Sequence, residues 1–221
     1  MKQYFLGIDT SCYTTSCAII DDELNIVGEA RKILDVKSGM KGLQQSNMVF
    51  QHTKVLPRLI EELVQVPLSG IGVSAFPRRA DDSYMPAFLV GHSFGRAISH
   101  MMKVPMYEFS HQENHILAAW RDIGSIPHQP FYDLHLSGGT TELVLTEYQG
   151  KGVFESSIIG GSNDLQGGQF VDRVGVALGL QFPCGKELER LALQTDTYDP
   201  LPSSVKDGWI SFAGPCSAAL R

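Results

Sequence analysis

The sequence predicts an α/β protein with two similar subdomains that face each other across a cleft. Short apolar runs near the start of each half are typical of antiparallel strands. Residues at helical spacing follow each group of runs, and the turns within the groups are rich in glycine and hydroxyl residues. A chain of 221 residues with 43% apolar residues is long enough to bury the cores of two such subdomains.

The first half begins as an antiparallel meander and then alternates between helices and strands. Apolar runs separated by polar turns predict strands over residues 4–9, 16–20 and 26–33. Helical periodicity predicts a helix over residues 43–64, which Pro57 is expected to kink or break. The remaining elements of this half are predicted as a strand over 70–75, a helix over 86–102, a strand over 104–107 and a helix over 111–121.

The second half repeats the meander. Strands are predicted over residues 131–136, 141–146 and 152–159, helices over 164–180 and 185–193, and a loop over 195–207. The shared strand–turn–strand layout suggests an internal repeat with a boundary near Glu108, which gives subdomains 1–108 and 109–221. Two hairpins that merely look alike remain the alternative.

Composition excludes several classes of protein. The 18 Lys and Arg against 24 Asp and Glu give a net charge of −6, which argues against a free-standing nucleic-acid binder. No apolar run approaches the length of a membrane-spanning helix or a secretory signal, so we expect a cytoplasmic protein without membrane association. The four cysteines form no Cys-x-x-Cys pair, so reduced thiols are expected.

Three features of the sequence suit ligand binding, two of them in the meanders and one on a predicted helix. The turn Ser137-Gly138-Gly139-Thr140 can present several backbone N–H groups to an anion, although a plain hairpin is the alternative. Asp9 ends the first strand, where a carboxylate can orient a metal-bound water or a reacting group, and a turn-capping aspartate is the alternative. Asp172 follows a glycine pair on a predicted helix and is either a ligand contact or a solvent-facing acid.

His111 and His115 are four residues apart on a predicted helix. This spacing puts both imidazoles on one face, within reach of one metal ion. The zinc-protease pattern needs a glutamate directly after the first histidine, and Gln112 stands there, so peptidase chemistry is disfavoured. Surface or capping histidines are the alternative to a metal site.

Taken together, six segments resemble the Gcp/TsaD family of tRNA threonylcarbamoyladenosine transferases, formerly called O-sialoglycoprotein endopeptidases. They match the family motifs L-G-I-E-T-S-C, H-x-E-G-H, V-S-G-G-H-T-Q-L, D-D-A-A-G-E-A-F-D-K, L-L-G-L-x-Y-P-G-G and S-F-S-G. In this chain the corresponding segments are, in order, residues 6–12 (LGIDTSC), 111–115 (HQENH), 136–143 (LSGGTTEL), 163–173 (NDLQGGQFVDR), 178–185 (LGLQFPCG) and 211–214 (SFAG).

The resemblance implies a duplicated actin-like ATPase (ASKHA) fold, two ribonuclease-H-like halves around a nucleotide cleft, with the second half incomplete. It implies one iron or zinc ion on His111 and His115, with a third ligand beyond residue 221. Asp9, from its place at the end of the first strand, is the candidate catalytic residue. The implied contacts to ATP, AMP or threonylcarbamoyl-adenylate are Leu136, Ser137, Gly138, Gly139, Asp172 and Gly185. The implied reaction transfers threonylcarbamoyl to the tRNA adenosine beside the anticodon.

The chain departs from the family at the cleft. Tyr13 and Thr14 replace an acidic pair, Thr140 replaces a histidine, and Cys184 replaces the first glycine of Pro-Gly-Gly. A non-catalytic paralogue that acts as a binding or scaffold subunit is therefore one alternative, and an ASKHA kinase-like ATPase is another, which the histidine pair disfavours. The expected partners are a TsaB-like protein or a second copy of the chain, and the acidic balance predicts tRNA contact only together with such partners.

Overall fold

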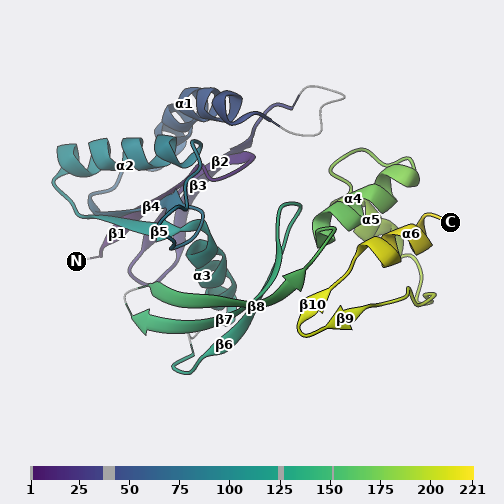
Figure 1. Cartoon of the computed structure of the whole chain (residues 1–221). Coiled ribbons are helices and arrows are strands. Elements are labelled where there is room, and N and C mark those ends of the chain that lie inside the picture. Colours follow the sequence, from purple (N-terminus) through teal and green to yellow (C-terminus); the bar gives the residue numbers. More distant parts are fainter. Residues whose placement is uncertain (1, 37–42, 124–126, 151) are drawn as a thin grey trace. The chain divides into compact units, whose positions relative to one another are not determined.

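Two five-stranded sheets organise the chain in the computed structural model, which describes residues 2–36, 43–123, 127–150 and 152–221 (Figure 1). The first sheet belongs to a unit that spans Met1–Ser125, and the second belongs to a unit that spans Ile126–Arg221. We refer to them as unit 1 and unit 2. Mixed sheets with helices confirm the predicted α/β class.

Unit 1 has the strand order β3-β2-β1-β4-β5, in which β1 to β3 are antiparallel neighbours and β4 and β5 run parallel to β1. This is the order of the ribonuclease-H-like half that the resemblance implies. Its elements are β1 (Tyr4–Asp9), β2 (Thr14–Asp21), β3 (Ile26–Ile33), α1 (Gln45–Glu62), β4 (Leu68–Phe76), α2 (Phe88–Met102), β5 (Met106–Ser110) and α3 (His111–Ile123).

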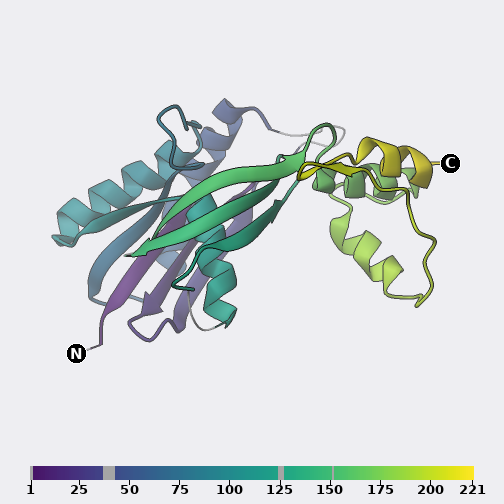
Figure 2. The same ribbon diagram turned by 60° about the horizontal axis from the view of Figure 1, so that its bottom comes forward.

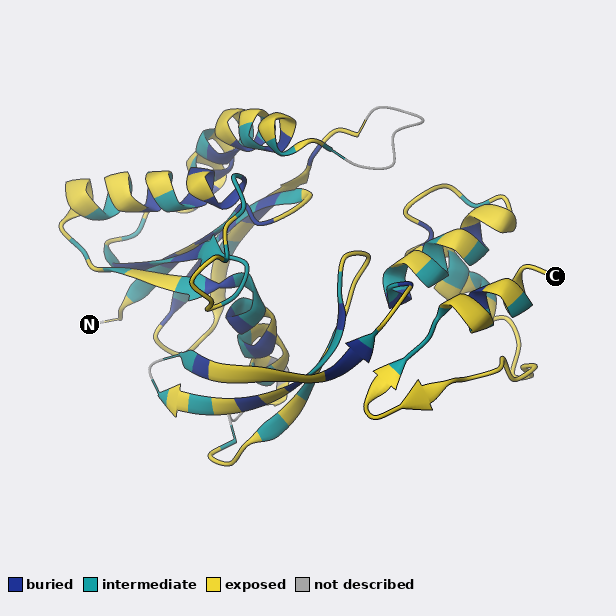
Figure 3. Ribbon diagram, viewed as in Figure 1, coloured by how far each residue is buried: buried dark blue, intermediate teal, exposed yellow. Residues whose placement is uncertain are grey.

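The core of unit 1 lies between the sheet and helices α1 and α2. Alternate residues of the strands point to this face, and among them Leu6, Ile71 and Val73 are buried against Leu56 of α1. The outer sides of both helices are exposed (Figure 3). Helix α3 lies on the other face of the sheet (Figures 1 and 2).

Helix α1 passes through Pro57 without interruption from Gln45 to Glu62. The expected break at this proline is therefore wrong. A proline inside a helix removes one backbone hydrogen bond and strains the preceding turn. Here the buried stripe continues on both sides of the proline, so packing on the sheet outweighs the local cost. That stripe consists of Met48, His52, Leu56 and Leu59.

The division between the units falls after Ser125, whereas the sequence placed a boundary after Glu108. The difference is helix α3, which packs on β4 and β5 of unit 1. One of its contacts is a hydrogen bond of 2.5 Å from the Asn114 side-chain amide to the Ser74 hydroxyl. A periodicity pattern does not reveal which sheet a helix covers, so this assignment needed the tertiary structure.

Unit 2 begins with a meander of β6 (Phe131–Leu136), β7 (Thr141–Gly150) and β8 (Val153–Ser162), as predicted. Helices α4 (Gly167–Ala177) and α5 (Gly185–Ala192) follow. The strand order is β6-β7-β8-β10-β9, so β6 is an edge strand among the described residues, whereas its counterpart β1 is central. The repeat therefore covers the meander, and the second half is incomplete relative to the first.

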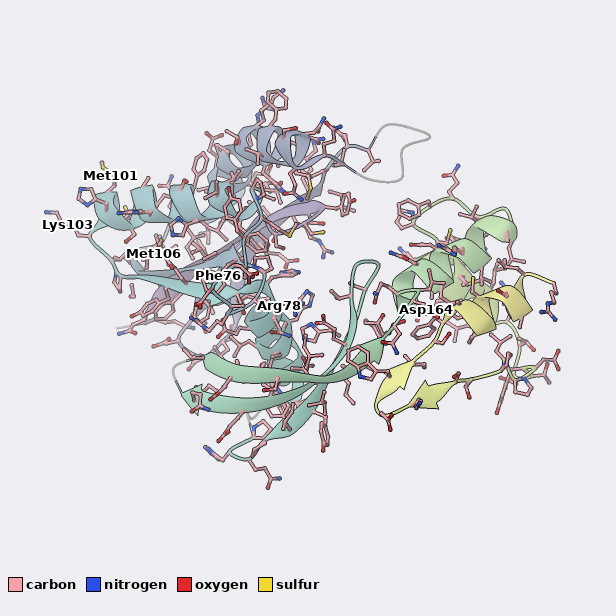
Figure 4. The ribbon with its side chains drawn as sticks, viewed as in Figure 1. Phe76, Arg78, Met101, Lys103, Met106 and Asp164 are labelled. Carbon is pink, nitrogen blue, oxygen red and sulfur yellow. The ribbon has the colours of Figure 1, made fainter. Side chains whose placement is uncertain are left out.

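Three short elements of unit 2 escaped the sequence prediction: β9 (Val205–Lys206), β10 (Trp209–Ile210) and α6 (Ala213–Ala219). The start of α6 is tied to the end of β8 by Asp164, labelled in Figure 4. Its carboxylate accepts hydrogen bonds from the Ser211 hydroxyl at 2.6 Å and from the Phe212 amide at 3.0 Å. The hydrogen bond from Ser211, with those from backbone amides, lowers the pKa of Asp164 to about 2.

None of the described helices combines the length and the hydropathy that a membrane span requires. The four cysteines are free thiols, with Cys12 exposed and the other three buried.

Candidate functional site

Asp9 stands at the carboxyl end of β1, at the start of a loop that is anchored on both sides. Its Oδ1 accepts the Ser11 amide at 2.6 Å. The next residue, Thr10, is fully buried, donates to the Ala87 carbonyl at 2.9 Å and accepts the Gly91 amide at 3.0 Å. The turn-capping role of Asp9 is therefore real, and helix α2 holds the loop that carries it.

His111 and His115 lie on one face of α3, as their spacing predicts. Their Nε2 atoms are 3.0 Å apart and their ring centroids 4.4 Å apart. The other ring nitrogen of the first histidine, His111 Nδ1, lies 3.5 Å from Asp9 Oδ2. Unit 1 thus brings together the candidate catalytic residue and both candidate metal ligands, although they come from opposite ends of the unit's sequence.

The carboxylate of Asp9 is held in its charged form. Burial by itself raises its pKa, but the nearby His111 imidazole and the hydrogen bonding of Ser11 outweigh that effect and lower the pKa to about 2. A general base works best when its pKa lies near the working pH. Asp9 is therefore poorly suited to accept a proton and well suited to remain an anion beside an imidazole.

A capping box fixes the start of α3, the turn that carries His111. The Glu113 amide donates to Ser110 Oγ at 3.1 Å, and Glu113 Oε2 accepts the Ser110 amide at 2.7 Å. Arg79, from the loop after β4, donates to Glu113 Oε1 at 2.6 Å and to the Glu108 carbonyl at 3.1 Å. This capping box was not predicted, although the spacing Ser-x-x-Glu is a recognised helix-start signal.

His52 supports the loop that follows Asp9, and it was not predicted as a functional residue. Its ring is fully buried, with Nδ1 2.8 Å from the Thr15 hydroxyl and Nε2 3.0 Å from the Cys12 carbonyl oxygen. Burial lowers the pKa of His52, so the neutral ring is favoured. No signal in the sequence singled it out, because it occupies one position of an otherwise apolar helical stripe.

A cavity of about 510 Å³ opens beside Asp9 on the α3 side of the sheet. Thr14 lines it, together with Ser74 and Asn114, so hydroxyl and amide side chains form part of its wall. Thr14 and its neighbour Tyr13 replace the acidic pair of the family, and the Tyr13 side chain is exposed. No carboxylate other than Asp9 and Glu29 lines this cavity within the described part of the chain.

The histidine pair has donors and a spacing that suit a metal ion. Two nitrogen ligands at about 2.0–2.1 Å from one tetrahedral ion lie about 3.3 Å apart, close to the 3.0 Å that separates the two Nε2 atoms. Imidazoles suit both zinc and iron. The described residues contain no group of three or more histidine, cysteine or acidic side chains placed to hold a metal, so an ion held by this pair would need a third ligand from outside this set.

The second group of candidate residues lies in unit 2, around the turn between β6 and β7. Ser137 Oγ accepts the amides of Gly139 at 3.1 Å and Thr140 at 2.9 Å. Two of the backbone amides that were predicted to face an anion therefore donate hydrogen bonds within the turn. Ser137 to Gly139 are exposed, as is the preceding Leu136.

Helix α4 begins directly against this turn. The Gly168 amide donates to the Ser137 carbonyl at 3.0 Å, and the Gln169 side-chain amide donates to the Gly138 carbonyl at 2.9 Å. A Cβ atom on Gly168 would lie 2.6 Å from the Gly138 nitrogen, so only glycine permits this approach.

Asp172 and Gly185 are joined through the residue between them in space, Cys184. Asp172 Oδ1 accepts a hydrogen bond from the Cys184 amide at 2.8 Å. Cys184 directly precedes Gly185, the first residue of helix α5. Cys184, which replaces a family glycine, is buried against Gly175 of α4. Unit 2 therefore connects the predicted contacts Ser137 to Gly139 and Asp172 to Gly185 through α4.

Comparison with known proteins gives one family. The family model of TsaD, tRNA N6-adenosine threonylcarbamoyltransferase, matches residues 84–221. A tRNA N6-adenosine threonylcarbamoyltransferase of Thermus thermophilus is 31% identical over 222 aligned positions, which cover 99% of this chain and 67% of that protein. One of Dehalococcoides mccartyi is 28% identical over 220 positions, which cover 98% of this chain and 66% of that protein. The chain thus spans about two thirds of the length of these relatives.

Two solved structures show limited similarity. YeaZ from Pseudomonas aeruginosa aligns with a TM-score of 0.46 at 12% identity, over 71% of this chain and 67% of that one. The (R)-2-hydroxyglutaryl-CoA dehydratase component A of Acidaminococcus fermentans aligns with a TM-score of 0.48 at 16% identity, over 99% of this chain and 67% of that one. Similarity at this level has no bearing on function. The family match and the full-length sequence similarity show that the chain belongs to the TsaD family of tRNA N6-adenosine threonylcarbamoyltransferases.

Proposed function

We propose that this chain binds one iron or zinc ion through His111 and His115, binds an adenine nucleotide in unit 2, and transfers threonylcarbamoyl from its adenylate to the amine of the tRNA adenosine beside the anticodon. The observation that carries the proposal is the convergence of the two Nε2 atoms at 3.0 Å in a member of the TsaD family. The two ring nitrogens, joined in the structure by a hydrogen bond, face one point that an ion would occupy in place of that bond.

The metal would be held by the two imidazoles and a third ligand outside the described set. When bound, it supplies a Lewis acid that polarises an acyl or phosphoryl oxygen. The residues of the chain would bind the reactants and orient them toward each other.

The adenylate is assigned to the turn Ser137–Gly139, with Leu136, Asp172 and Gly185 around it. Gly138 has no atom within 4 Å of the position of a Cβ, so its outer side is open to a ligand. Asp172 offers a carboxylate, the group that typically accepts hydrogen bonds from ribose hydroxyls. Ser137 offers a hydroxyl at the exposed end of the same turn.

The transfer depends on the positioning of the two reactants more than on a strong base that removes the amine proton. The amine nitrogen attacks the acyl carbon, a C–N bond forms, the bond from that carbon to the phosphate oxygen breaks, and AMP leaves. Tyr13 and Thr14 are not bases at neutral pH, and Asp9 has a pKa of about 2. The amine proton therefore goes to the departing phosphate or to solvent, and the protein contributes orientation of the two reactants.

Metal and nucleotide binding are tested separately on the full chain. We expect about one equivalent of zinc or iron by elemental analysis, and its loss in the His111→Ala/His115→Ala variant. We expect AMP binding by calorimetry that Asp172→Asn weakens and Asp196→Asn, a change in an exposed loop, leaves unaltered. Asparagine keeps the acceptor for the Cys184 amide, so the fold of the Asp172 variant is preserved.

Transfer itself is tested with tRNA, threonylcarbamoyl-adenylate and a complete set of partner proteins, and the product is the modified adenosine detected by mass spectrometry. Product formation that depends on His111 and His115 supports the proposal. A chain that binds metal and AMP yet forms no product under these conditions would contradict the transferase assignment and favour a binding subunit.

A further inference from the structure

We propose that Asp9 is a positioning residue for the metal site: its carboxylate stands 3.5 Å from His111 Nδ1, where it can accept the Nδ1–H and so make Nε2 the ligand atom. This inference rests on the proposed function, because it concerns the metal that His111 and His115 would hold. It reassigns the aspartate from a group that meets the reactants to one that acts through a histidine.

The geometry leaves His111 Nδ1 facing Asp9. This nitrogen is buried and makes no hydrogen bond in the structure, and Asp9 Oδ2 lies 3.5 Å from it. The other carboxylate oxygen, Oδ1, is already engaged by the Ser11 amide at 2.6 Å. Oδ2 is thus the oxygen that faces the ring, and a small rotation of either side chain brings the pair to hydrogen-bond distance.

The carboxylate decides which nitrogen of His111 carries the proton. An anion beside Nδ1 favours a proton on that nitrogen, which leaves the lone pair on Nε2. In the structure this lone pair faces the His115 Nε2 atom at 3.0 Å. With an ion present, the same lone pair is available as a ligand. Histidine ligands commonly have such a carboxylate behind them, which orients the ring and raises its basicity.

The loop of Asp9 is built to hold the carboxylate still. Buried Thr10 joins it to α2 through the Ala87 carbonyl and the Gly91 amide. The side chain of Asp9 itself is only 30% exposed. On the other side, the capping box of Ser110 and Glu113 fixes the first turn of α3. Two separately anchored elements therefore meet at the contact between Asp9 and His111.

The test measures metal affinity on the full chain, using zinc alone in competition with a chromophoric chelator. Asp9→Asn keeps the acceptor for the Ser11 amide but removes the charge, and we expect a loss of about 10- to 100-fold in zinc affinity. Asp9→Glu restores the carboxylate at the position where the family motif has glutamate, and we expect affinity close to that of the unchanged chain.

A matched control separates positioning from general charge effects. Asp21 is a carboxylate of the same sheet that likewise accepts an amide two residues ahead, from Glu23 at 2.9 Å, but it pairs with Lys2 and not with a histidine. Asp21→Asn is expected to leave zinc affinity unchanged. Cobalt absorption gives a second readout, because a reoriented imidazole shifts the visible bands of bound cobalt in Asp9→Asn but not in Asp21→Asn.

The possible outcomes separate a failure of the proposed function from a failure of this inference alone. If the unchanged chain binds no zinc, the metal part of the proposed function fails and this inference fails with it. If the unchanged chain binds zinc and Asp9→Asn binds it equally well with the same cobalt spectrum, only this inference fails. A loss of affinity in Asp9→Asn that Asp9→Glu does not recover would also overturn it.

Discussion

At the scale of single residues, His52 is a titratable side chain that lies fully buried in unit 1. A titratable ring is completely buried beneath the loop that follows Asp9, and both of its nitrogens are engaged. The neutral ring satisfies both contacts, because Nε2–H donates to the Cys12 carbonyl oxygen and Nδ1 accepts from the Thr15 hydroxyl. The loop is therefore supported by a histidine that must stay uncharged.

This arrangement predicts a pH-dependent stability. The folded pKa of His52 is lowered, so its contribution is complete above the unfolded pKa of about 6.5 and is lost as the pH falls toward the folded value. His52→Gln keeps one donor and one acceptor but does not titrate. We expect the free energy of unfolding, from denaturant titrations at pH 7.5 and 5.5, to fall less in this variant than in the unchanged chain. Equal falls would show that His52 does not titrate on unfolding.

At the scale of elements, helix α3 is the part of unit 1 whose placement matters most. Arg79 reaches across from the loop after β4 and pairs with Glu113, whose side chain is 3% exposed. Glu113 in turn completes the capping box. An ion pair between a loop and the start of a helix fixes the position of the helix along its axis. The histidine pair lies on the same helix, so its position is fixed as well.

A double-mutant cycle measures this connection. Arg79→Gln leaves a buried carboxylate with weaker compensation, and Glu113→Gln removes the charge that Arg79 pairs with. Because Arg79 is 39% exposed, water screens part of the interaction, and we expect a coupling free energy of about 1 kcal/mol in denaturant unfolding. Strictly additive effects would mean that the pair does not hold α3.

At the scale of the whole molecule, the net charge of −6 limits what the chain does alone. Phosphate contacts supply most of the affinity of a protein for nucleic acid, and an acidic surface repels the tRNA backbone. Contact with tRNA is therefore expected to need a protein partner with a basic surface, which a second copy of this acidic chain would not supply.

The corresponding prediction concerns the isolated chain. Its dissociation constant for tRNA at physiological salt is expected to be no tighter than about 1 μM, in the range of non-specific binding, and to weaken further as salt is added. Fluorescence anisotropy with labelled tRNA over a salt series measures both. Tight binding that salt does not weaken would contradict the requirement for a partner.

The sequence predicted most elements because their signals are local. Both meanders and all five helices predicted from periodicity are present, and the strands β1, β3 and β6 have the predicted bounds. The short strands β9 and β10 and helix α6 escaped because two-residue strands have no periodicity, and their position depends on β8 and on Asp164. The break at Pro57 did not occur, because a rule about isolated helices ignores the sheet that α1 packs on.

By itself, the sequence determined that His111 and His115 share a face, since four residues advance a helix by about one turn. It also determined the family, through motifs spread along the whole chain. Only the tertiary structure decided that Asp9 lies beside His111 and that Arg79 holds Glu113. Helical spacing is a property of neighbouring residues. Contacts between distant segments depend on the parallel alignment of β1, β4 and β5, which packing of the apolar core establishes.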